Sequence, residues 1–228
     1  MQPYIFPYIG YFQLINAVDV FVFYDDVNFI KKGWINRNQI LVNEKANLFS
    51  VPLSKVSQNK LINEIKLAID EKWIKQFYNT IEHSYRRAPF YQDTFELIHY
   101  VFEGKHQTIA DLTIKSIEQI SKYLNISTIF ERSFEKYADT KGMEKADRLI
   151  KISQLCGASE YINPSGGQKL YNKQYFKKHH IDLFFIQNKI VSYPQFAANF
   201  VGGLSIIDVL MFNSKEHIKD MLTEYILV

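Results

Sequence analysis

The sequence is poor in several residue types that would otherwise define its chemistry. It has one cysteine, Cys156, so neither an intrachain disulfide nor a cluster of cysteine metal ligands can form. No apolar stretch approaches the roughly 18 residues of a membrane-spanning helix, and the longest, Val20–Tyr24, has the length of a strand. The first residues lack the basic and apolar regions of a signal peptide, so we expect a cytoplasmic protein.

Arginine is also scarce. The chain has 27 basic residues and a net charge of +3, but its only arginines are Arg37, Arg86, Arg87, Arg132 and Arg148. There is no dense basic tract, which disfavours a dedicated DNA-binding protein and leaves tRNA as an open partner. Because a guanidinium binds phosphates and carboxylates better than an ammonium does, the arginines are candidate anchors for a small anionic ligand.

The chain contains enough apolar residues for one folded domain: 47% of its 228 residues are hydrophobic. Helices are expected at 8–18, 71–87, 89–103, 108–124, 143–156, 172–179 and after 205, strands at 20–24, 63–69, 127–132, 159–162 and 181–186, and a hairpin over 39–53 that turns near Asn43–Ala46. Trp73, Phe77, Ile81 and Tyr85 are spaced to share one face of the helix at 71–87, and Thr108 with Asp111 has capping-box spacing at the start of the helix at 108–124. Alternation of strands and helices at both ends predicts an α/β fold with a mainly parallel, Rossmann-like sheet. The helical segment 71–124 would be an insertion or cap within a single domain, 1–228.

Three segments carry candidate binding groups. The first is the opening loop and helix, where Gly10 predicts close approach by a ligand or a neighbouring strand. The second is Asp25-Asp26, directly after a buried strand, where open α/β sheets bind ligands. The third is residues 31–38, whose amide, guanidinium and indole donors suit a nucleotide or sugar. Each also has a structural interpretation: a rigid aromatic packing element, a strand-end turn, or a solvated loop anchored by Trp34.

A fourth segment, Asn163-Pro-Ser-Gly-Gly, follows a predicted strand and could expose backbone N–H groups to a phosphate or carboxylate. It matches neither a Walker A nor a dinucleotide fingerprint, and a tight turn explains it almost as well. The histidines, including His179-His180, lack metal-ligand spacing, so no metal site is expected. Cys156 is expected to be a buried apolar residue.

Three stretches together resemble the WbqC-like family. They are MQPYIFPYIGYFQLINAVDVFVFYDDVNFIKKGWINRNQIL, YINPSGGQKLY and GLSIIDVLMFN, which lie at residues 1–41, 161–171 and 203–213. The resemblance spans essentially the whole chain. It implies a bacterial protein of O-antigen and related lipopolysaccharide biosynthesis, with a role in acylating an amino sugar, for example with a glycyl group. Members usually carry a short apolar strand before the Gln-Pro; here we expect it either to be minimal or to lie outside the given sequence.

A second, weaker resemblance is to nucleotidylyltransferases. In those enzymes an H-x-G-H motif opens a helix, and Tyr8 and Tyr11 occupy the two histidine positions here. Tyrosine can donate a hydrogen bond but carries no positive charge at neutral pH, so ATP activation by that route is doubtful.

These observations lead to two hypotheses. The first is an N-acyl or aminoacyl transferase, or an ATP-dependent amide ligase, that forms an amide on a nucleotide-linked amino sugar; its donor is an adenylate made from ATP, a carrier thioester or aminoacyl-tRNA. The second is a non-catalytic nucleotide-sugar-binding or scaffolding protein of the same pathway. The expected catalytic residues are Asp25, Asp26 and Tyr11, and the expected binding residues are Gln2, Tyr8, Gly10, Asn28, Lys31, Lys32, Trp34, Asn36, Arg37, Asn38, Asn163, Ser165, Gly166 and Gly167.

Overall fold

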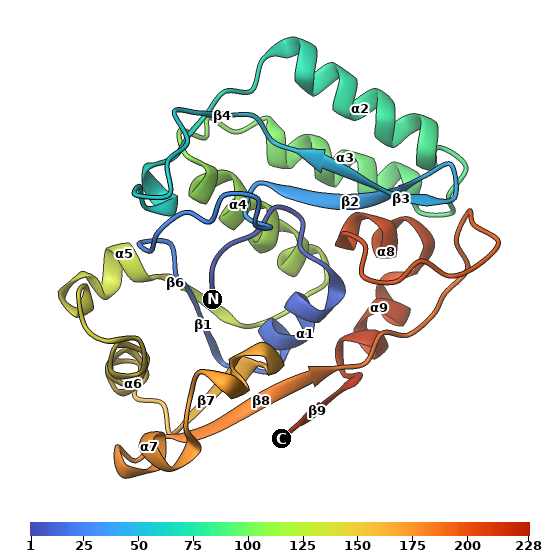
Figure 1. Cartoon of the computed structure of the whole chain (residues 1–228). Coiled ribbons are helices and arrows are strands. Elements are labelled where there is room, and N and C mark those ends of the chain that lie inside the picture. Colours follow the sequence, from blue (N-terminus) through green and yellow to red (C-terminus); the bar gives the residue numbers. More distant parts are fainter.

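The computed structural model describes residues 1–228 as a mixed α/β protein (Figure 1). Its α-helices are α1 (Ile9–Asn16), α2 (Glu71–Tyr85), α3 (Tyr91–Phe102), α4 (Ile109–Tyr123), α5 (Ser133–Lys136), α6 (Lys145–Leu155), α7 (Lys173–Lys178), α8 (Ile206–Phe212) and α9 (Lys215–Leu222). Its strands are β1 (Val20–Phe23), β2 (Arg37–Val42), β3 (Lys45–Ser50), β4 (Leu53–Ser54), β5 (Lys66–Leu67), β6 (Ile129–Arg132), β7 (Glu160–Pro164), β8 (Asp182–Asn188) and β9 (Tyr225–Leu227). Short 3₁₀ turns are η1 (Ile62–Glu64), η2 (Ala138–Thr140) and η3 (Ser165–Lys169).

The strands form four separate small sheets rather than one. β1 pairs with β6 and β7 pairs with β8, both in parallel, and β9 adds to β8 antiparallel. The β2–β3 hairpin and the β4–β5 pair are antiparallel. Two of these five pairings are parallel, and no ladder joins β1 to β7, so the expected mainly parallel, Rossmann-like sheet is not observed.

Residue Met1 occupies part of the edge of β1 that β6 leaves free. Its ammonium donates to the Val22 carbonyl over 2.6 Å, and the Tyr24 N–H donates to the Met1 carbonyl over 2.8 Å. Burial lowers the pKa of this ammonium from 8.0 to about 5, although the charge of Asp25 opposes that shift. Two hydrogen bonds are too few to extend the β1–β6 ladder toward β7.

Most expected helices lie where their patterns place them. The Thr108 hydroxyl caps the start of α4, and the Asp111 carboxylate accepts the Thr108 N–H, which completes the expected capping box. Asn125 and Gly157 end α4 and α6 with positive φ angles of 56° and 68°. The strand expected at 63–69 is mostly wrong, because η1 takes up its first half and only β5 is extended.

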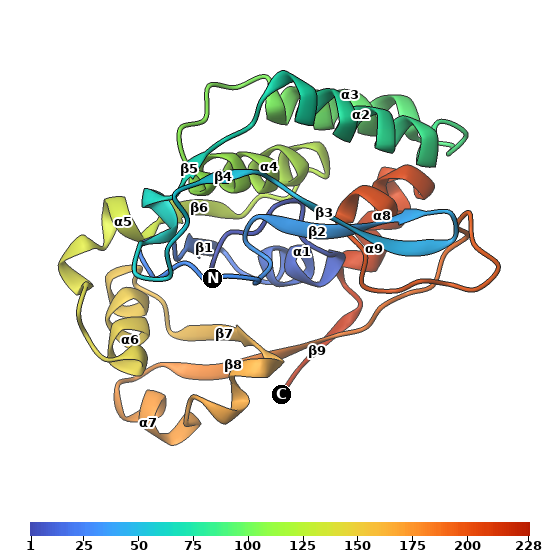
Figure 2. The same ribbon diagram turned by 45° about the horizontal axis from the view of Figure 1, so that its top comes forward.

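One hydrophobic cluster of 40 buried residues joins the N-terminal segment to α2–α4 and to α8 and α9. In Figures 1 and 2, α2, α3 and α4 lie together on one side of the molecule, and β7, β8, α6 and α7 lie on the other. A second cluster of 5 buried residues, including Phe176 and Phe185, fills the space between α6, α7 and β8. The helical segment 71–124 thus shares its core with both chain ends.

Candidate functional site

The adjacent carboxylates Asp25 and Asp26 end β1 and are buried, at 0% and 3% exposure. Asp25 Oδ2 accepts hydrogen bonds from Arg132 Nε and pairs with Arg132 Nη2, each over 2.8 Å. Asp26 Oδ2 accepts a hydrogen bond of 2.6 Å from Arg148 Nη2. Each carboxylate therefore has its own arginine. The Asp26–Arg148 pair is shielded from water, whereas the Arg132 side chain is 23% exposed and also pairs with Asp111 and Glu135.

A serine ties the two pairs together. Ser133, at the start of α5, donates its hydroxyl to Asp26 Oδ1 over 2.5 Å and accepts the Asp25 N–H over 3.2 Å. The remaining Asp25 oxygen accepts the Phe134 N–H over 3.1 Å. We call Asp25, Asp26, Arg132, Ser133 and Arg148 the carboxylate network. It fastens the carboxyl ends of β1 and β6 to α5 and α6. The carboxylate oxygens of Asp25 and Asp26 all have hydrogen-bond donors within the protein, and a catalytic role for either residue stays a prediction.

The N-terminal segment, residues 1–8, lies against the other candidate groups. Asn38 is buried, and its amide donates to the carbonyls of Ile5 and Phe6 over 3.1 and 2.7 Å. The Tyr11 hydroxyl donates to the Gln2 carbonyl over 2.9 Å. Burial raises the pKa of Tyr11 well above its ordinary value. Asn38 and Tyr11 therefore hold backbone inside the protein, and the binding role of Asn38 and the catalytic role of Tyr11 stay predictions.

The start of α1 meets the end of β8. The Tyr8 hydroxyl donates to the Asn188 amide oxygen over 3.3 Å, and the Asn188 amide nitrogen donates to the Gly10 carbonyl over 3.1 Å. A Cβ built on Gly10 would lie 2.3 Å from the Tyr8 ring and 2.9 Å from Asn188 Cγ. Any larger residue at position 10 would therefore force the Tyr8 ring and the Asn188 side chain to move.

Tyr161, Tyr171 and Tyr24 lie between the Asn163 loop and the carboxylate network. Asn163 donates to the Tyr161 hydroxyl over 2.8 Å, and Tyr171 lies 3.3 Å from a Cβ built on Gly167. Burial raises the pKa of Tyr24, and Tyr171 is near enough to add to that shift. The charge of Arg148, whose guanidinium lies 4.6 Å from the Tyr24 ring, opposes it. Ser165 and Gly166 are exposed at the start of η3.

Residues 28–37, which we call the arginine loop, carry the exposed binding groups. Asn28, Lys31, Lys32 and Trp34 are exposed, and Trp34 keeps 47% of its surface. Arg37 opens β2, where its Nε donates to the Gly33 carbonyl over 2.7 Å and its guanidinium lies 5.9 Å from the Trp34 ring centroid. No carboxylate pairs with Arg37, so its two terminal nitrogens are free to bind an anion.

The neighbouring Asn36 is bonded to backbone through both its peptide and its side chain. Its amide donates to the Val51 carbonyl over 2.9 Å, and the Val51 N–H donates to the Asn36 carbonyl over 2.7 Å. These two bonds join the arginine loop to the segment that follows β3.

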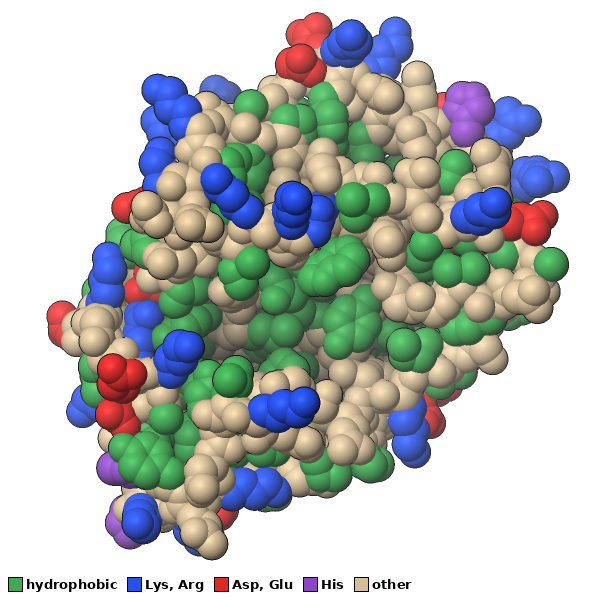
Figure 3. All heavy atoms as spheres, in the orientation of Figure 1, with side chains coloured by type: hydrophobic (Ala, Val, Ile, Leu, Met, Phe, Trp, Pro, Cys, Tyr) green, Lys and Arg blue, Asp and Glu red, His purple; other side chains and the backbone are tan.

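The face shown in Figure 3 is hollowed near its centre. Hydrophobic side chains floor the hollow, and several Lys and Arg side chains stand around it. It lies over the N-terminus and α1 of Figure 1. An apolar floor with a basic rim suits a ligand that joins a ring or sugar to an anionic group.

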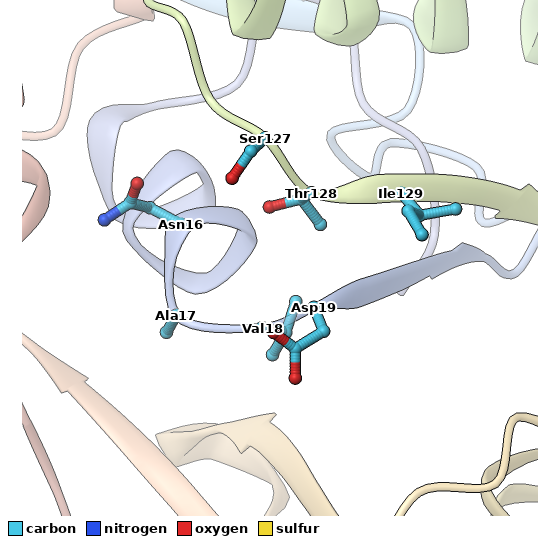
Figure 4. Close-up of a pocket in the computed structure, with 7 residues that line it drawn as sticks. All are labelled: Asn16, Ala17, Val18, Asp19, Ser127, Thr128 and Ile129. Carbon is cyan, nitrogen blue, oxygen red and sulfur yellow. The ribbon is translucent and has the colours of Figure 1, made fainter.

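A cavity of about 320 Å³ lies elsewhere, at the amino ends of β1 and β6 (Figure 4). Its lining includes Asn16, Asp19, Ser127 and Thr128, and the Thr128 hydroxyl is already bonded to the Ile15 carbonyl over 2.7 Å. Ligands of open α/β sheets bind at the opposite, carboxyl ends of the strands, so we do not place the site here.

Sequence reasoning singled out Arg132 and Arg148 as scarce arginines but did not pair them with Asp25 and Asp26. The signal was present, since Arg132 ends a strand expected to be parallel to β1. A second network had no such signal: buried Asp208 accepts hydrogen bonds from Tyr85, Tyr193 and Gln195 over 2.8, 2.8 and 2.5 Å. Cys156 was expected to be apolar and buried; it is half-buried and lies 2.9 Å from the Tyr137 hydroxyl.

Two further features of the chain bear on function. No group of three or more His, Cys, Asp or Glu side chains is placed to hold a metal ion. None of the helices is both long enough and apolar enough to cross a membrane.

Comparison with known proteins adds the chain's relationships. It is 28% identical over 219 residues to the Mycobacterium tuberculosis (strain ATCC 25618 / H37Rv) protein named "Uncharacterized protein Rv1507c", and the match covers 95% of this chain and 93% of the relative. No solved structure matches. The model of the WbqC-like protein family matches residues 2–220, and the chain therefore belongs to the WbqC-like protein family.

Proposed function

We propose that this protein acts on a nucleotide-linked amino sugar, which it binds along the arginine loop and on whose amino group it forms an amide during biosynthesis of a surface polysaccharide such as O-antigen. The observation that supports binding is the state of Arg37. Of the five arginines, Arg132 and Arg148 are paired with buried carboxylates, whereas Arg37 is held by one backbone carbonyl and has no carboxylate partner. A positioned, unpaired guanidinium is suited to a diphosphate.

The neighbouring side chains suggest how the ligand lies. Lys32 would add charge beside the diphosphate, and exposed Trp34 would stack on the nucleobase. The first N–H groups of η3, at Ser165 and Gly166, have no acceptor within that turn. They would stabilise the oxyanion that develops when the sugar amine attacks an activated acyl carbon. The amide bond then forms as the donor's leaving group departs, and the amine proton passes to a base.

Binding is tested by calorimetric titration of UDP- and dTDP-linked amino sugars into the wild type, Arg37→Lys and Arg86→Lys. Arg86 is an exposed arginine at the end of α2 and serves as the matched control. Arg37→Lys is expected to weaken binding about tenfold or more, since hydrogen bonds to charged groups contribute roughly 1.5–3 kcal/mol. Unchanged affinity in Arg37→Lys would remove Arg37 from the site.

A second candidate function is non-catalytic binding or scaffolding in the same pathway. The closed carboxylate network favours it, because the expected bases Asp25 and Asp26 are buried and paired. Incubating the bound amino sugar with an acyl adenylate, a thioester or aminoacyl-tRNA separates the two functions. Formation of an N-acylated sugar with any of the three supports the enzyme, and intact ligand with all three supports the binding protein.

A further inference from the structure

A second cavity, of about 380 Å³, adjoins the arginine loop. It is lined by Asn28, Phe29, Ile30, Lys31, Gln58 and Asn59. This volume is at the lower end of the range of roughly 300–1,000 Å³ that ligand pockets span, which suits one sugar ring better than a whole nucleotide.

The walls of this cavity are held by backbone pairing that begins at the carboxylate network. The Asn63 N–H donates to the Asp25 carbonyl over 3.1 Å, and the Ile62 N–H donates to the Val27 carbonyl over 2.9 Å. Farther out, the Phe29 N–H donates to the Lys60 carbonyl over 2.8 Å. The cavity therefore lies between two paired segments of fixed backbone, and apart from Phe29 its lining residues are exposed.

The polar side chains of the cavity are all unused. The side chains of Asn28, Gln58 and Asn59 make no hydrogen bond to another protein group, and Lys31 pairs with no carboxylate. A primary amide offers donors and an acceptor, and a sugar hydroxyl needs both. The ammonium of Lys31 is exposed and the lining contains no carboxylate, so Lys31 is free to pair with an anionic group of a ligand.

The lining also disfavours a nucleobase. Base recognition relies on stacking against an exposed ring, but Phe29 is 2% exposed and contributes only apolar floor. The exposed ring of the arginine loop is Trp34, beside Arg37. A nucleotide would therefore occupy the Trp34–Arg37 end of the loop and its sugar the Asn28–Lys31 end.

We propose that this cavity binds the sugar unit of the nucleotide sugar and selects a sugar that carries a carboxylate, which pairs with Lys31. The inference rests on the proposed function, because it needs the nucleotide to bind at Arg37. It adds a substrate class: an acidic sugar, whose hydroxyls are bound by Asn28, Gln58 and Asn59.

Isothermal titration of UDP, UDP-glucose and UDP-glucuronic acid, and of the dTDP forms, tests the proposal. The glucuronic and glucose forms differ in the carboxylate. In the wild type the acidic form is expected to bind about tenfold more tightly than the neutral form. Lys31→Gln should abolish that ratio, and Gln58→Leu should weaken both sugars relative to the free nucleotide. Lys45→Gln, which removes an exposed lysine from β3, is the matched control and should leave the ratio unchanged.

The outcomes separate the two proposals. Equal affinity for the acidic and neutral forms, with the free nucleotide still bound, overturns the acidic-sugar inference alone. A preference that survives Lys31→Gln also overturns it. Absence of binding by every nucleotide overturns the proposed function and this inference with it.

Discussion

The arginines of this protein lie in two contrasting regions. In the carboxylate network, Arg148 is 4% exposed and donates hydrogen bonds to Asp26 and to the Thr140 hydroxyl. Its guanidinium also packs over the Tyr24 ring. In the arginine loop, Arg37 is half-buried and bonds only a backbone carbonyl, with an exposed tryptophan beside it. The same side chain is fully paired in one region and left with free donors in the other.

The difference indicates how each region contributes to function. Buried charges must be paired, because removing one partner leaves an ion without water or counterion. The carboxylate network therefore maintains the fold at the ends of β1 and β6. An unpaired guanidinium at a surface costs little, and its donors stay available. The contrast predicts that substitutions in the network affect stability and that substitutions in the loop affect binding.

The largest effect is expected for Arg148→Met, which keeps the length of the side chain and removes its charge. Asp26 would then be a buried carboxylate with only Ser133 as a donor. We expect a loss of about 3–5 kcal/mol in the free energy of unfolding, measured by urea denaturation. Arg86→Met, at an exposed and unpaired position, should change it by no more than about 0.5 kcal/mol. Equal losses in both variants would show that the Asp26–Arg148 pair does not stabilise the fold.

A smaller effect separates the two regions by one conservative change. Arg132→Lys replaces two contacts to Asp25 by a single ammonium, and we expect it to cost about 1–2 kcal/mol of stability. Arg37→Lys should cost less than about 0.5 kcal/mol, because Arg37 pairs with no carboxylate. Thermal melts of both variants measure the difference. Similar melting temperatures in the two variants would contradict the assignment of separate roles.

The smallest effect is expected from salt. Raising the ionic strength from about 0.05 M to 0.5 M shortens the screening length, which weakens interactions between exposed charges more than interactions between buried ones. We expect the affinity for UDP to fall several-fold while the urea midpoint changes little. Calorimetry and denaturation at both salt concentrations measure the two responses. A fall in stability that matches the fall in affinity would show that the carboxylate network is open to solvent.

Local patterns in the sequence predicted most helices and strands of this fold. The apolar spacing of Phe77, Ile81 and Tyr85 identified the buried face of α2, and Thr108 with Asp111 identified the start of α4. The turn expected near Asn43–Ala46 lies at Asn43 and Glu44, both with positive φ. These features depend on residues a few positions apart, which share one element.

Long-range pairing was harder to predict. The sequence identified Asp25 and Asp26 as strand-end carboxylates, but their partners Arg132, Ser133 and Arg148 lie more than 100 positions away. Arg132 ends a predicted strand, which was a signal, but nothing local distinguishes Arg148 from Arg37. Asn38 follows exposed Trp34 by four positions and was therefore grouped with the binding residues. Its amide is nevertheless buried against the N-terminal segment.

The bonds that hold the N-terminal segment also set the order in which the chain can fold. The Phe6 carbonyl accepts a hydrogen bond from the Ser205 hydroxyl, 199 positions away. The Gln13 amide donates to the Met221 and Glu224 carbonyls, 208 and 211 positions away. At a synthesis rate of about 5–20 residues per second, those partners leave the ribosome roughly 10–40 seconds after the first residues. During that interval the aromatic opening of the chain has its bonds to Ile35 and Asn38 but lacks those to the C-terminal residues. We therefore expect this segment of newly made protein to stay accessible to chaperones until residues 205–224 emerge.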